Sequence, residues 1–531
     1  MCGISLLLGA VMDATDRRRF DGMVAGIAQR GESLEEERGP HALLATSRLK
    51  IVDRDHAVQP WRTGSDRYSL CFNGEVFNFA ELASRLEGEG VVLRSTSDTE
   101  VVAEAVLAWG IPALLEFRGE FAIALVDHSD GSVFLARDPA GIKPLYWVRT
   151  PGRLFVASEI KALSGLGHPV HEVPPGHCGT GSADRDPALA PYLDLLALGG
   201  SEPPIEDVAT ATGAVRSAVT EAVRRRVDTD LPVGVILSGG LDSSLVATLI
   251  ARLHPDCVAF TVGSPGSEDL DYARRLTAEL GMRHEVVEVT PHQIGAAQVR
   301  EAVRVSEATE YGDVINAVVS MEVFAAVHAA GVKVVLTGDG SDELFGGYSM
   351  YGSVDGSATR RLFLHKIHQL SRTELQRVDR TSMGQCVEAR VPFLDLDLLL
   401  LAMRIPVSMK VRDGYEKWVL REAFRDDLPD YILARHKNPM SHSSGLHERV
   451  RLYKPMMPRW YRSFGYDVAG PMRRDFSIEL LRADNQLEAA LVAADRAEDY
   501  SWSERARDFA GAVRWNLANA RTPGRSSREG R

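Results

Sequence analysis

A glycine-rich turn, Ser238 to Ser244 with the sequence SGGLDSS, constrains the fold of this chain more than any other segment. The apolar run Leu231 to Leu237 precedes the turn and predicts a buried strand. Asp242 to Leu253 follows it, with apolar residues on one helical face. Such a strand-to-helix turn points backbone N–H groups and a helix N-terminus at an anion, so we predict a phosphate-binding site here.

Strands and helices continue to alternate beyond this turn. Further strands are predicted at 257–262, 284–289 and 332–336, with a helix ending near Leu280 between the first two. Alternation of this kind predicts an α/β domain, in which a parallel sheet has helices on both faces. The rest of the chain, to about Leu517, has mostly helical patterns.

The first part of the chain has the pattern of short strands joined by hairpin turns. A strand from Tyr68 to Phe72 is expected to end in a turn at Asn73 and Gly74, and residues 98–109 are expected to form a helix. Two hairpins are predicted, each with a turn signal between its strands: 121–127 with 132–137, and 146–149 with 154–157.

A chain of 531 residues is too long for a single core. The stretch from about Pro174 to Pro204 is rich in Gly, Pro and Ala and is expected to contain a linker. The expected organisation is a first domain at 2–180, a linker at 181–206, a second domain at 207–517 and a disordered tail at 518–531.

Bulk properties limit the kinds of partner. The net charge of −12 disfavours nucleic acid, because phosphate binding needs a basic surface. The five cysteines are scattered, without the spacing of a metal site or a disulfide framework. The N-terminus lacks the features of a signal peptide, and its apolar run, Ile4 to Val11, is too short to span a bilayer. We expect a cytoplasmic protein without a membrane partner.

Cys2 becomes the N-terminal residue once Met1 is removed, and it then carries its own base. A free α-amino group titrates at about pH 8, so it can take the thiol proton directly or through a water. Other N-terminal nucleophiles use the same arrangement. A cysteine at position 2 is weak evidence alone, and the surrounding motifs decide its meaning.

Six further segments supply these motifs: Ser47–Asp53, Asn73–Asn78, Ser97–Asp98, Arg118–Ala122, Ala136–Tyr146 and Ala157–Leu163. In this order they resemble the class II glutamine amidotransferase domain, over roughly residues 2 to 180. The resemblance implies an α+β N-terminal-nucleophile fold, in which two stacked antiparallel sheets lie between helices. It also implies that Cys2 releases ammonia from glutamine.

The same resemblance assigns tasks to the residues of the first site. Arg48 would bind the α-carboxylate of glutamine as a planar fork, and Glu75 and Asp98 would bind its α-ammonium group. The side-chain amide of Asn73 and the N–H of Gly74 would form the oxyanion hole. The other residues of the glutamine pocket would be Leu49, Lys50, Ile51 and Val52.

The chain departs from this family at two places. Family members usually read His-Arg-Gly-Pro-Asp where this chain has Gln29 to Ser33, with Glu32 in the fourth position. They also usually have His in place of Phe79. These positions line or brace the glutamine pocket, so the departures bear on glutaminase efficiency and coupling.

The turn at Ser238 lacks the Gly-Lys-Ser/Thr of kinase-type phosphate loops. It resembles that of ATP pyrophosphatases, which cleave ATP between the α and β phosphates. Over about residues 210 to 510 the chain resembles asparagine synthetases, which implies ATP and Mg²⁺ as cofactors and a carboxylate acceptor activated as its acyl-adenylate. The matching segments are Ala259–Gly263, Asp269–Leu270, Leu280–Glu285, Leu336–Tyr348, Arg380–Met383, Glu388–Asp395, Lys417–Phe424 and Arg435–Lys437.

This second resemblance also assigns site residues. Asp242 and Asp342 are the implied Mg²⁺ ligands, because a hard cation bound to phosphates takes a few carboxylates plus water. Lys437, supported by Lys417, would neutralise the leaving pyrophosphate, and Asp339 would orient the acceptor or the ammonia. The implied ATP-binding residues are Leu237, Ser238, Gly239, Gly240, Leu241, Asp242, Ser243, Ser244, Val262, Thr337, Gly338 and Lys417.

Together the two resemblances imply a glutamine-dependent amidotransferase of the asparagine synthetase type, with aspartate as the default acceptor. Glu307 to Asn316 departs from the family's acceptor segment, so another carboxylate used in specialised biosynthesis stays open. An ATP-dependent cyclase similar to β-lactam synthetases, a non-catalytic scaffolding homologue and a plain glutaminase also stay open. Retention of Cys2 argues against the first of these, and retention of Asp242, Asp342 and Lys437 against the second. A homodimer is compatible with the sequence.

Overall fold

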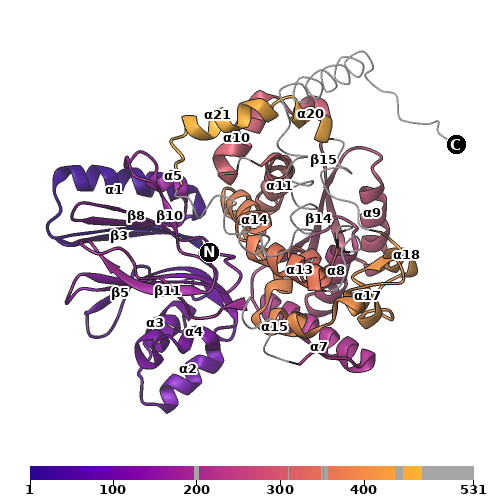
Figure 1. Cartoon of the computed structure of the whole chain (residues 1–531), viewed down its shortest axis with the longest axis horizontal. Helices are drawn as coiled ribbons and strands as arrows, with labels where there is room; N and C mark the ends of the chain where they lie inside the picture. The colour runs from indigo at the N-terminus through magenta and orange to yellow at the C-terminus, as the bar shows by residue number, and fades with distance from the viewer. Residues whose placement is uncertain are drawn as a thin grey trace.

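The structure is a computed structural model that describes residues 1–54, 56–195, 203–308, 310–348, 351, 357–436 and 446–468. Two antiparallel sheets lie face to face in the amino-terminal part, and one parallel sheet forms the centre of the rest (Figure 1). The first sheet has the order β10 (His171–Glu172), β8 (Tyr146–Thr150), β9 (Arg153–Ala157), β1 (Cys2–Gly9), β3 (Ala42–Arg48), β2 (Ser33–Arg38). The second has the order β12 (Ala190–Pro191), β11 (His177–Ser182), β7 (Ser132–Arg137), β6 (Gly119–Asp127), β5 (Tyr68–Val76), β4 (Trp61–Arg62).

Helices cover the outer face of each of these sheets (Figure 1). Along β1, Ile4 and Leu6 are buried between the two sheets, whereas Leu7 packs against α1 (Ala14–Ile27) on the outside. The alternation follows from the two-residue period of a strand. Three helices lie over the second sheet: α2 (Phe79–Gly88), α3 (Asp98–Trp109) and α4 (Ala113–Glu116). The expected helix–sheet–sheet–helix fold is confirmed, and so are both predicted hairpins.

The turn predicted at Asn73 and Gly74 is wrong. Strand β5 runs on through both residues to Val76, and Gly74 pairs with Phe121 of β6. A Cβ on Gly74 would lie 2.0 Å from the carbonyl oxygen of Glu120, so the glycine permits close approach of two strands. A second difference concerns the Gly-, Pro- and Ala-rich stretch, where β11 and β12 extend the second sheet into the expected linker.

The second part of the chain is built on five parallel strands, as the alternating pattern predicts. Their order is β15 (Arg283–Glu288), β14 (Val258–Gly263), β13 (Val233–Ile236), β16 (Val334–Leu336), β17 (Glu388–Arg390). The helices of this part are α7 (Val208–Val227), α8 (Leu241–Leu253), α9 (Glu268–Leu280), α10 (Ala296–Ser306), α11 (Tyr311–Ala329), α12 (Ser341–Phe345), α13 (Ser357–Gln369), α14 (Glu374–Met383), α15 (Leu396–Arg404), α16 (Val407–Lys410), α17 (Trp418–Ala423), α18 (Asp430–Leu433), α20 (His447–Arg451) and α21 (Met457–Ser463). The first part of the chain has one more short helix, α5 (Ile160–Leu163). A short hairpin, β18 (Val411–Arg412) with β19 (Tyr415–Glu416), precedes α17.

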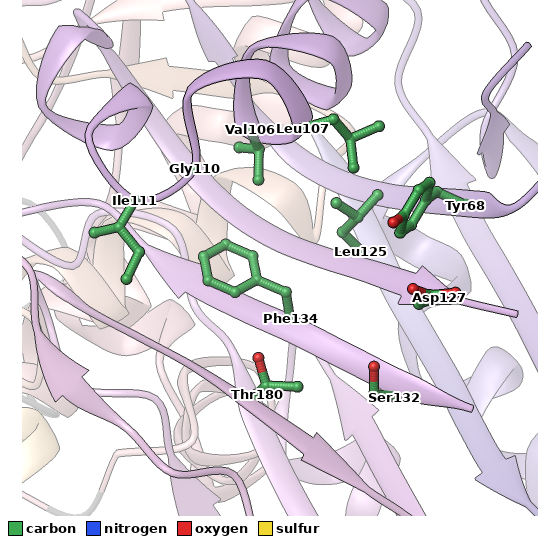
Figure 2. Close-up of a pocket in the computed structure, with 10 residues that line it drawn as sticks. All are labelled: Tyr68, Val106, Leu107, Gly110, Ile111, Leu125, Asp127, Ser132, Phe134 and Thr180. Carbon is green, nitrogen blue, oxygen red and sulfur yellow. The ribbon is translucent and has the colours of Figure 1, made fainter. Parts of the chain in front are cut away.

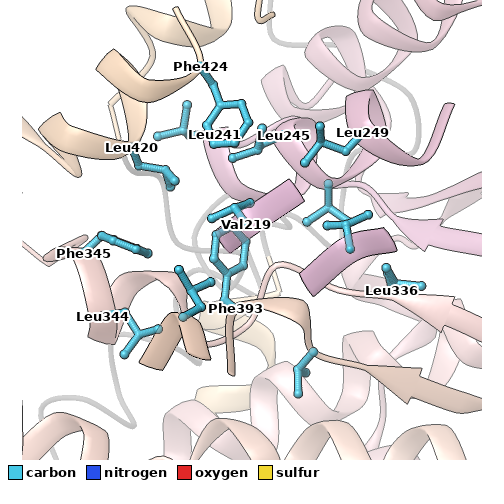
Figure 3. Packing of buried hydrophobic residues seen from close by; sticks show 14 of the residues in the cluster. Val219, Leu241, Leu245, Leu249, Leu336, Leu344, Phe345, Phe393, Leu420 and Phe424 are labelled. Atoms are coloured by element: carbon cyan, nitrogen blue, oxygen red, sulfur yellow. The ribbon is translucent and has the colours of Figure 1, made fainter. Parts of the chain in front are cut away.

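Two apolar layers hold this sheet. On one face, Leu245 of α8 packs with Val219 of α7, Leu336 of β16 and Phe393 in a single core (Figure 3). On the other, Phe324 of α11 belongs to a separate cluster that includes residues of β14 and α14. Among the described residues α11 is the one helix long and apolar enough to cross a membrane, and 56% of its apolar window is buried. In this fold α11 is a core helix, because it packs against β14, α10 and α14.

The strand order reverses at β13, because β14 and β15 lie on one side of it and β16 and β17 on the other. Ligands of open parallel sheets bind at such a reversal, outside the carboxyl ends of the strands. Ser238–Ser244 follows β13 there, and residues 337–342 follow β16. The topology therefore brings the predicted phosphate turn and the predicted Asp339 and Asp342 to one edge of the sheet.

Candidate functional site

Cys2 is the first residue of β1, and its side chain is buried. Its backbone N–H donates to Oδ1 of Asn73 at 3.0 Å. Burial raises the pKa of the Cys2 thiol, although the ammonium group of Met1 acts in the opposite direction. The neutral thiol is therefore favoured, and the site needs a base to produce the thiolate.

Asn73 has the arrangement of an oxyanion-hole donor. Its Oδ1 is held by Cys2, which fixes the orientation of the amide, whereas Nδ2 is buried without a hydrogen-bond partner among the described residues. An unpaired buried donor costs about 1–3 kcal/mol, so it is typical of a group that serves a ligand or an intermediate. The structure thus brings together Cys2, Asn73 and Gly74 as the sequence predicts.

Gly74→Ala is expected to lower stability by about 3 kcal/mol, because its Cβ would meet the Glu120 carbonyl and φ is +154°. The measurement is the thermal unfolding midpoint of the variant. Gly131→Ala is the matched control: Gly131 has a positive φ of +70°, but open space surrounds its Cβ position. Its cost should be about 1 kcal/mol, so equal destabilisation of both variants would contradict the close-approach explanation.

The predicted glutamine-binding residues surround Cys2. The Arg48 guanidinium donates to the Ala57 carbonyl and lies 3.6 Å from a carboxylate oxygen of Glu35. Asp98 begins α3, accepts from the N–H of Val76 at 3.4 Å, and burial raises its pKa to about 6. Leu49, Ile51 and Val52 pack around Met1, and Lys50 is half-buried.

Glu75 lies where this cluster meets the second part of the chain, near both Asp98 and Glu388. Its carboxylate pairs with Arg390 of β17, and burial raises the pKa of Glu75 despite that arginine. Glu388, two residues before Arg390, pairs with the Met1 ammonium at 2.7 Å. The edge of the parallel sheet therefore forms one wall of the Cys2 site.

The nucleotide-site residues also lie together. Gly239 has φ +69°, and a Cβ there would be 2.7 Å from Cβ of Tyr272. The N-terminus of α8, at Gly240, has no side-chain cap, so its N–H groups are available to an anion. A Cβ on Gly338 would lie 2.9 Å from Cβ of Asp242, which shows how closely the turn after β16 packs on the turn after β13.

Asp242 and Asp342 converge on one lysine. The Lys417 ammonium lies 2.5 Å from Oδ2 of Asp242 and 2.5 Å from Oδ1 of Asp342, and its side chain is 2% exposed. Ser341 donates to the other oxygen of Asp242 at 2.8 Å. A small polar pocket opens beside them, lined by Ser238, Gly240, Leu241, Asp242, Asp269, Glu416, Lys417, Arg421, Arg435 and His436.

The predicted adenosine residues Leu237 and Val262 lie at the same edge of the sheet, Leu237 directly after β13 and Val262 next to the last residue of β14. The hydroxyl oxygens of Ser244 and Thr337 are buried there without a hydrogen-bond partner among the described residues. Asp339 accepts from Arg377 at 3.0 Å. Lys437 lies outside the described residues.

Comparison with known proteins agrees with this arrangement. A family model described as glutamine amidotransferase domain matches residues 1–175, and one described as asparagine synthase matches residues 214–357 and 352–505. The chain belongs to the asparagine synthetase family.

Relatives in this family come from plants and bacteria. The chain is 32% identical to glutamine-hydrolysing asparagine synthetase 3 of Arabidopsis thaliana over 479 residues, which cover 84% of this chain and 79% of the relative. It is 32% identical to that of Sandersonia aurantiaca over 84% of this chain and 87% of the relative. Asparagine synthetase B of Escherichia coli is 30% identical over 84% of this chain and 83% of its own.

Two site residues of this asparagine synthetase family member are absent from the sequence-based prediction. Arg30 is fully buried, and its Nε donates to the carbonyl oxygen of Cys2 at 3.1 Å. Gln59 places Nε2 3.9 Å from the Cys2 sulfur and accepts from the N–H of Phe72 at 3.0 Å. Arg30 stands within Gln29 to Ser33, the segment that corresponds to a family motif. No sequence motif around Gln59 indicates that it lies near Cys2.

The departures from the family pattern at Gln29 and Glu32 have partners at the domain interface. Glu32 pairs with Lys333 at 2.6 Å and accepts from the N–H of Lys50 at 3.3 Å. Gln29 donates to Glu159 at 3.1 Å. Replacing the usual Pro-Asp by Glu32-Ser33 therefore adds a link between the glutamine pocket and the residue that precedes β16.

A larger pocket lies apart from both sites, on the second antiparallel sheet beside the end of α3 (Figure 2). It measures about 370 Å³. Apolar side chains such as Phe134 and Ile111 line most of it, with Asp127 at one end. None of the predicted site residues lines this pocket.

Proposed function

We propose that this chain is a glutamine-hydrolysing asparagine synthetase that forms asparagine from aspartate. One observation carries the proposal: a single chain holds both a buried Cys2 beside the unpaired Nδ2 of Asn73 and a carboxylate–lysine–carboxylate cluster at a phosphate turn. The first arrangement suits amide hydrolysis, and the second suits activation of a carboxylate. We expect the enzyme to work in the cytoplasm.

The first half-reaction uses the residues around Cys2. After removal of Met1, the α-amino group of Cys2 takes the thiol proton, which burial otherwise retains on sulfur. The sulfur attacks the side-chain amide carbon of glutamine. The side-chain amide of Asn73 and the backbone N–H of Gly74 stabilise the oxyanion. The protonated α-amino group gives its proton to the amide nitrogen as the C–N bond breaks, so ammonia leaves, and water then hydrolyses the γ-glutamyl thioester to glutamate and the free thiol.

The second site fits ATP with Mg²⁺. No group of three or more His, Cys, Asp or Glu in the described part of the chain could hold a metal by itself. At nucleotide sites Mg²⁺ is usually held by one or two protein carboxylates together with substrate phosphates and water, so Asp242 and Asp342 would hold it only with the nucleotide. The ion would neutralise charge on the phosphates when bound.

Protein groups complete this second half-reaction. The N–H groups at the start of α8 would orient the pyrophosphate, and Lys417, with Lys437, would neutralise charge as it leaves. Asp339 would lie beside the acyl-adenylate and orient the acceptor or the incoming ammonia. Ammonia from Cys2 would reach the activated carboxyl carbon through the domain interface, where exclusion of water protects it from protonation.

The test is pyrophosphate and AMP release from ATP–Mg²⁺ with glutamine, over aspartate and a panel of other carboxylic acids, with mass spectrometry of the products. Aspartate-dependent release with asparagine formed is the expected result. Release with only another acid would overturn aspartate as the acceptor. Glutamate release with no pyrophosphate for any acid would overturn synthetase activity.

The KM for glutamine is expected to rise as the pH falls through about 6. The pKa of Asp98 is raised to about 6, so below that pH the carboxyl is protonated and loses its attraction for the α-ammonium group. Asp98→Asn should show a high KM at every pH from about 5 to about 8. The measurement is glutaminase kinetics against pH, and an unchanged acid limb in the variant would rule out this role.

A further inference from the structure

Helix α14 lies between the two sites and carries an unusual set of buried polar residues. Nine of its ten residues, Leu375 to Met383, are buried. Among them are the charged side chains of Arg377, Asp379 and Arg380. Buried charges are retained where they are paired, so the partners of these residues show what the helix connects.

The carboxyl-terminal half of α14 reaches Cys2 through one arginine. Asp379 accepts two hydrogen bonds from Arg30, at 2.8 Å and 2.9 Å. The Nε of the same guanidinium donates to the Cys2 carbonyl at 3.1 Å, and Nη1 pairs with Glu159 at 2.6 Å. The Arg30 guanidinium therefore links the backbone of Cys2 to α14 through charge-assisted hydrogen bonds.

The amino-terminal half of the same helix reaches the other site. Arg377 donates to Asp339 at 3.0 Å and to Ser320 of α11 at 2.9 Å. It also pairs with Glu374 at 2.5 Å. Its Nε is buried without a hydrogen-bond partner among the described residues. Arg377 thus has competing partners, and a ligand that engages Asp339 would change the balance between them.

Other residues of the helix also fix it to both domains. Gln376 donates to the carbonyl oxygens of Ser306 and Glu307, both at 2.9 Å. The Glu307 carboxylate accepts from the N–H of Lys161, in the first domain, at 2.7 Å and from Arg380 at 3.2 Å. Glu307 therefore contributes to the domain interface, although its segment corresponds to the family's acceptor region.

We propose that α14 couples the two sites, with Arg377 and Asp379 as positioning residues that relate occupation of the acceptor site to the placement of Cys2. The proposal rests on the proposed function. A ligand at Asp339 shifts the partners of Arg377, and a packed helix transmits that shift as a unit. Arg377 and Asp379 lie within one helical turn, so the Asp379–Arg30 fork moves with Arg377. Cys2 is then positioned for glutamine attack only when an acceptor can use the ammonia.

The first test is the ratio of glutamate to pyrophosphate formed by Asp379→Asn with glutamine, ATP–Mg²⁺ and aspartate. We expect the ratio to rise at least about fivefold, with ammonia-dependent pyrophosphate release kept within about threefold of wild type. Asp397→Asn is the matched control, because Asp397 also bridges the domains, to Arg118 at 2.8 Å, but contacts neither site. A folded Asp379→Asn variant with the wild-type ratio would overturn the coupling role.

The second test covers failure of Asp379→Asn to fold, since breaking a buried ion pair is strongly destabilising. Arg377→Lys keeps the positive charge but loses the planar guanidinium that bonds Asp339 and Ser320 at the same time. The readout is the rate at which a diazoketone analogue of glutamine alkylates Cys2, with and without ATP–Mg²⁺ and aspartate. We expect these ligands to accelerate alkylation in the wild type and not in the variant.

Equal acceleration in both proteins, or none in the wild type, would overturn the coupling proposal. A wild type that releases no pyrophosphate with any nitrogen source would instead overturn the proposed function. The two failures are therefore distinguishable in one set of assays.

Discussion

Asp242→Asn is expected to lower aspartate-dependent pyrophosphate release by about a thousandfold while leaving glutaminase activity intact. Asp242 shares Lys417 with Asp342, and each carboxylate lies 2.5 Å from the lysine ammonium. The asparagine side chain keeps the size of the site but removes one negative charge. A cation that stabilises developing phosphate charge contributes several kcal/mol, and each 1.4 kcal/mol is about tenfold in rate.

The measurement is pyrophosphate release at saturating ATP–Mg²⁺, with glutamate release followed in the same samples. Asp271→Asn is the control, because Asp271 is an exposed carboxylate on the first turn of the neighbouring α9. It should retain full synthesis. If Asp242→Asn synthesised asparagine at the wild-type rate, the ion would have to be held by other residues.

Cys2→Ala is expected to abolish glutamine-dependent synthesis, by at least about ten-thousandfold, and to preserve synthesis from added ammonium salts. Cys2 supplies the sulfur that attacks glutamine, and its backbone contacts both Asn73, through the N–H, and Arg30, through the carbonyl oxygen. The second site has its own nucleotide and acceptor residues. Loss of Cys2 should therefore separate the two half-reactions.

Parallel assays with glutamine and with ammonium chloride as nitrogen source measure this separation. Cys178→Ala serves as the control, since Cys178 is a buried thiol of β11 in a core cluster away from both sites. Its activity should match the wild type with either nitrogen source. Glutamine-dependent synthesis by Cys2→Ala would show that another residue is the nucleophile.

Local sequence patterns were sufficient to predict the strand–turn–helix unit at Ser238 and most of the fold. Strand β13, the turn at Ser238 and helix α8 follow one another directly, so hydrophobic periodicity and glycine content define them without distant contacts. The parallel sheet then follows from strand–helix alternation. The convergence of Asp242 and Asp342 on one edge follows in turn from the strand order.

Other features depend on contacts between residues far apart in the chain, and sequence patterns do not reveal these. Asn73-Gly74 has the composition of a hairpin turn, but the close approach of the Glu120 carbonyl makes it part of a strand. Arg30 contacts both Cys2 and Asp379, although Asp379 lies 349 positions away from Arg30 in the sequence. Glu307 corresponds by position to the family's acceptor region. In the structure its carboxylate instead accepts hydrogen bonds from Lys161 and Arg380 at the domain interface.

Transfer of amide nitrogen from glutamine to aspartate tests the account most directly. The enzyme is supplied with amide-¹⁵N-glutamine, aspartate and ATP–Mg²⁺ in the presence of unlabelled ammonium, and the products are analysed by mass spectrometry. The account predicts asparagine labelled in its amide, with AMP and pyrophosphate formed in equal amounts. Labelled ammonium in solution without labelled asparagine would contradict the claim that the two sites act as one amide-forming enzyme.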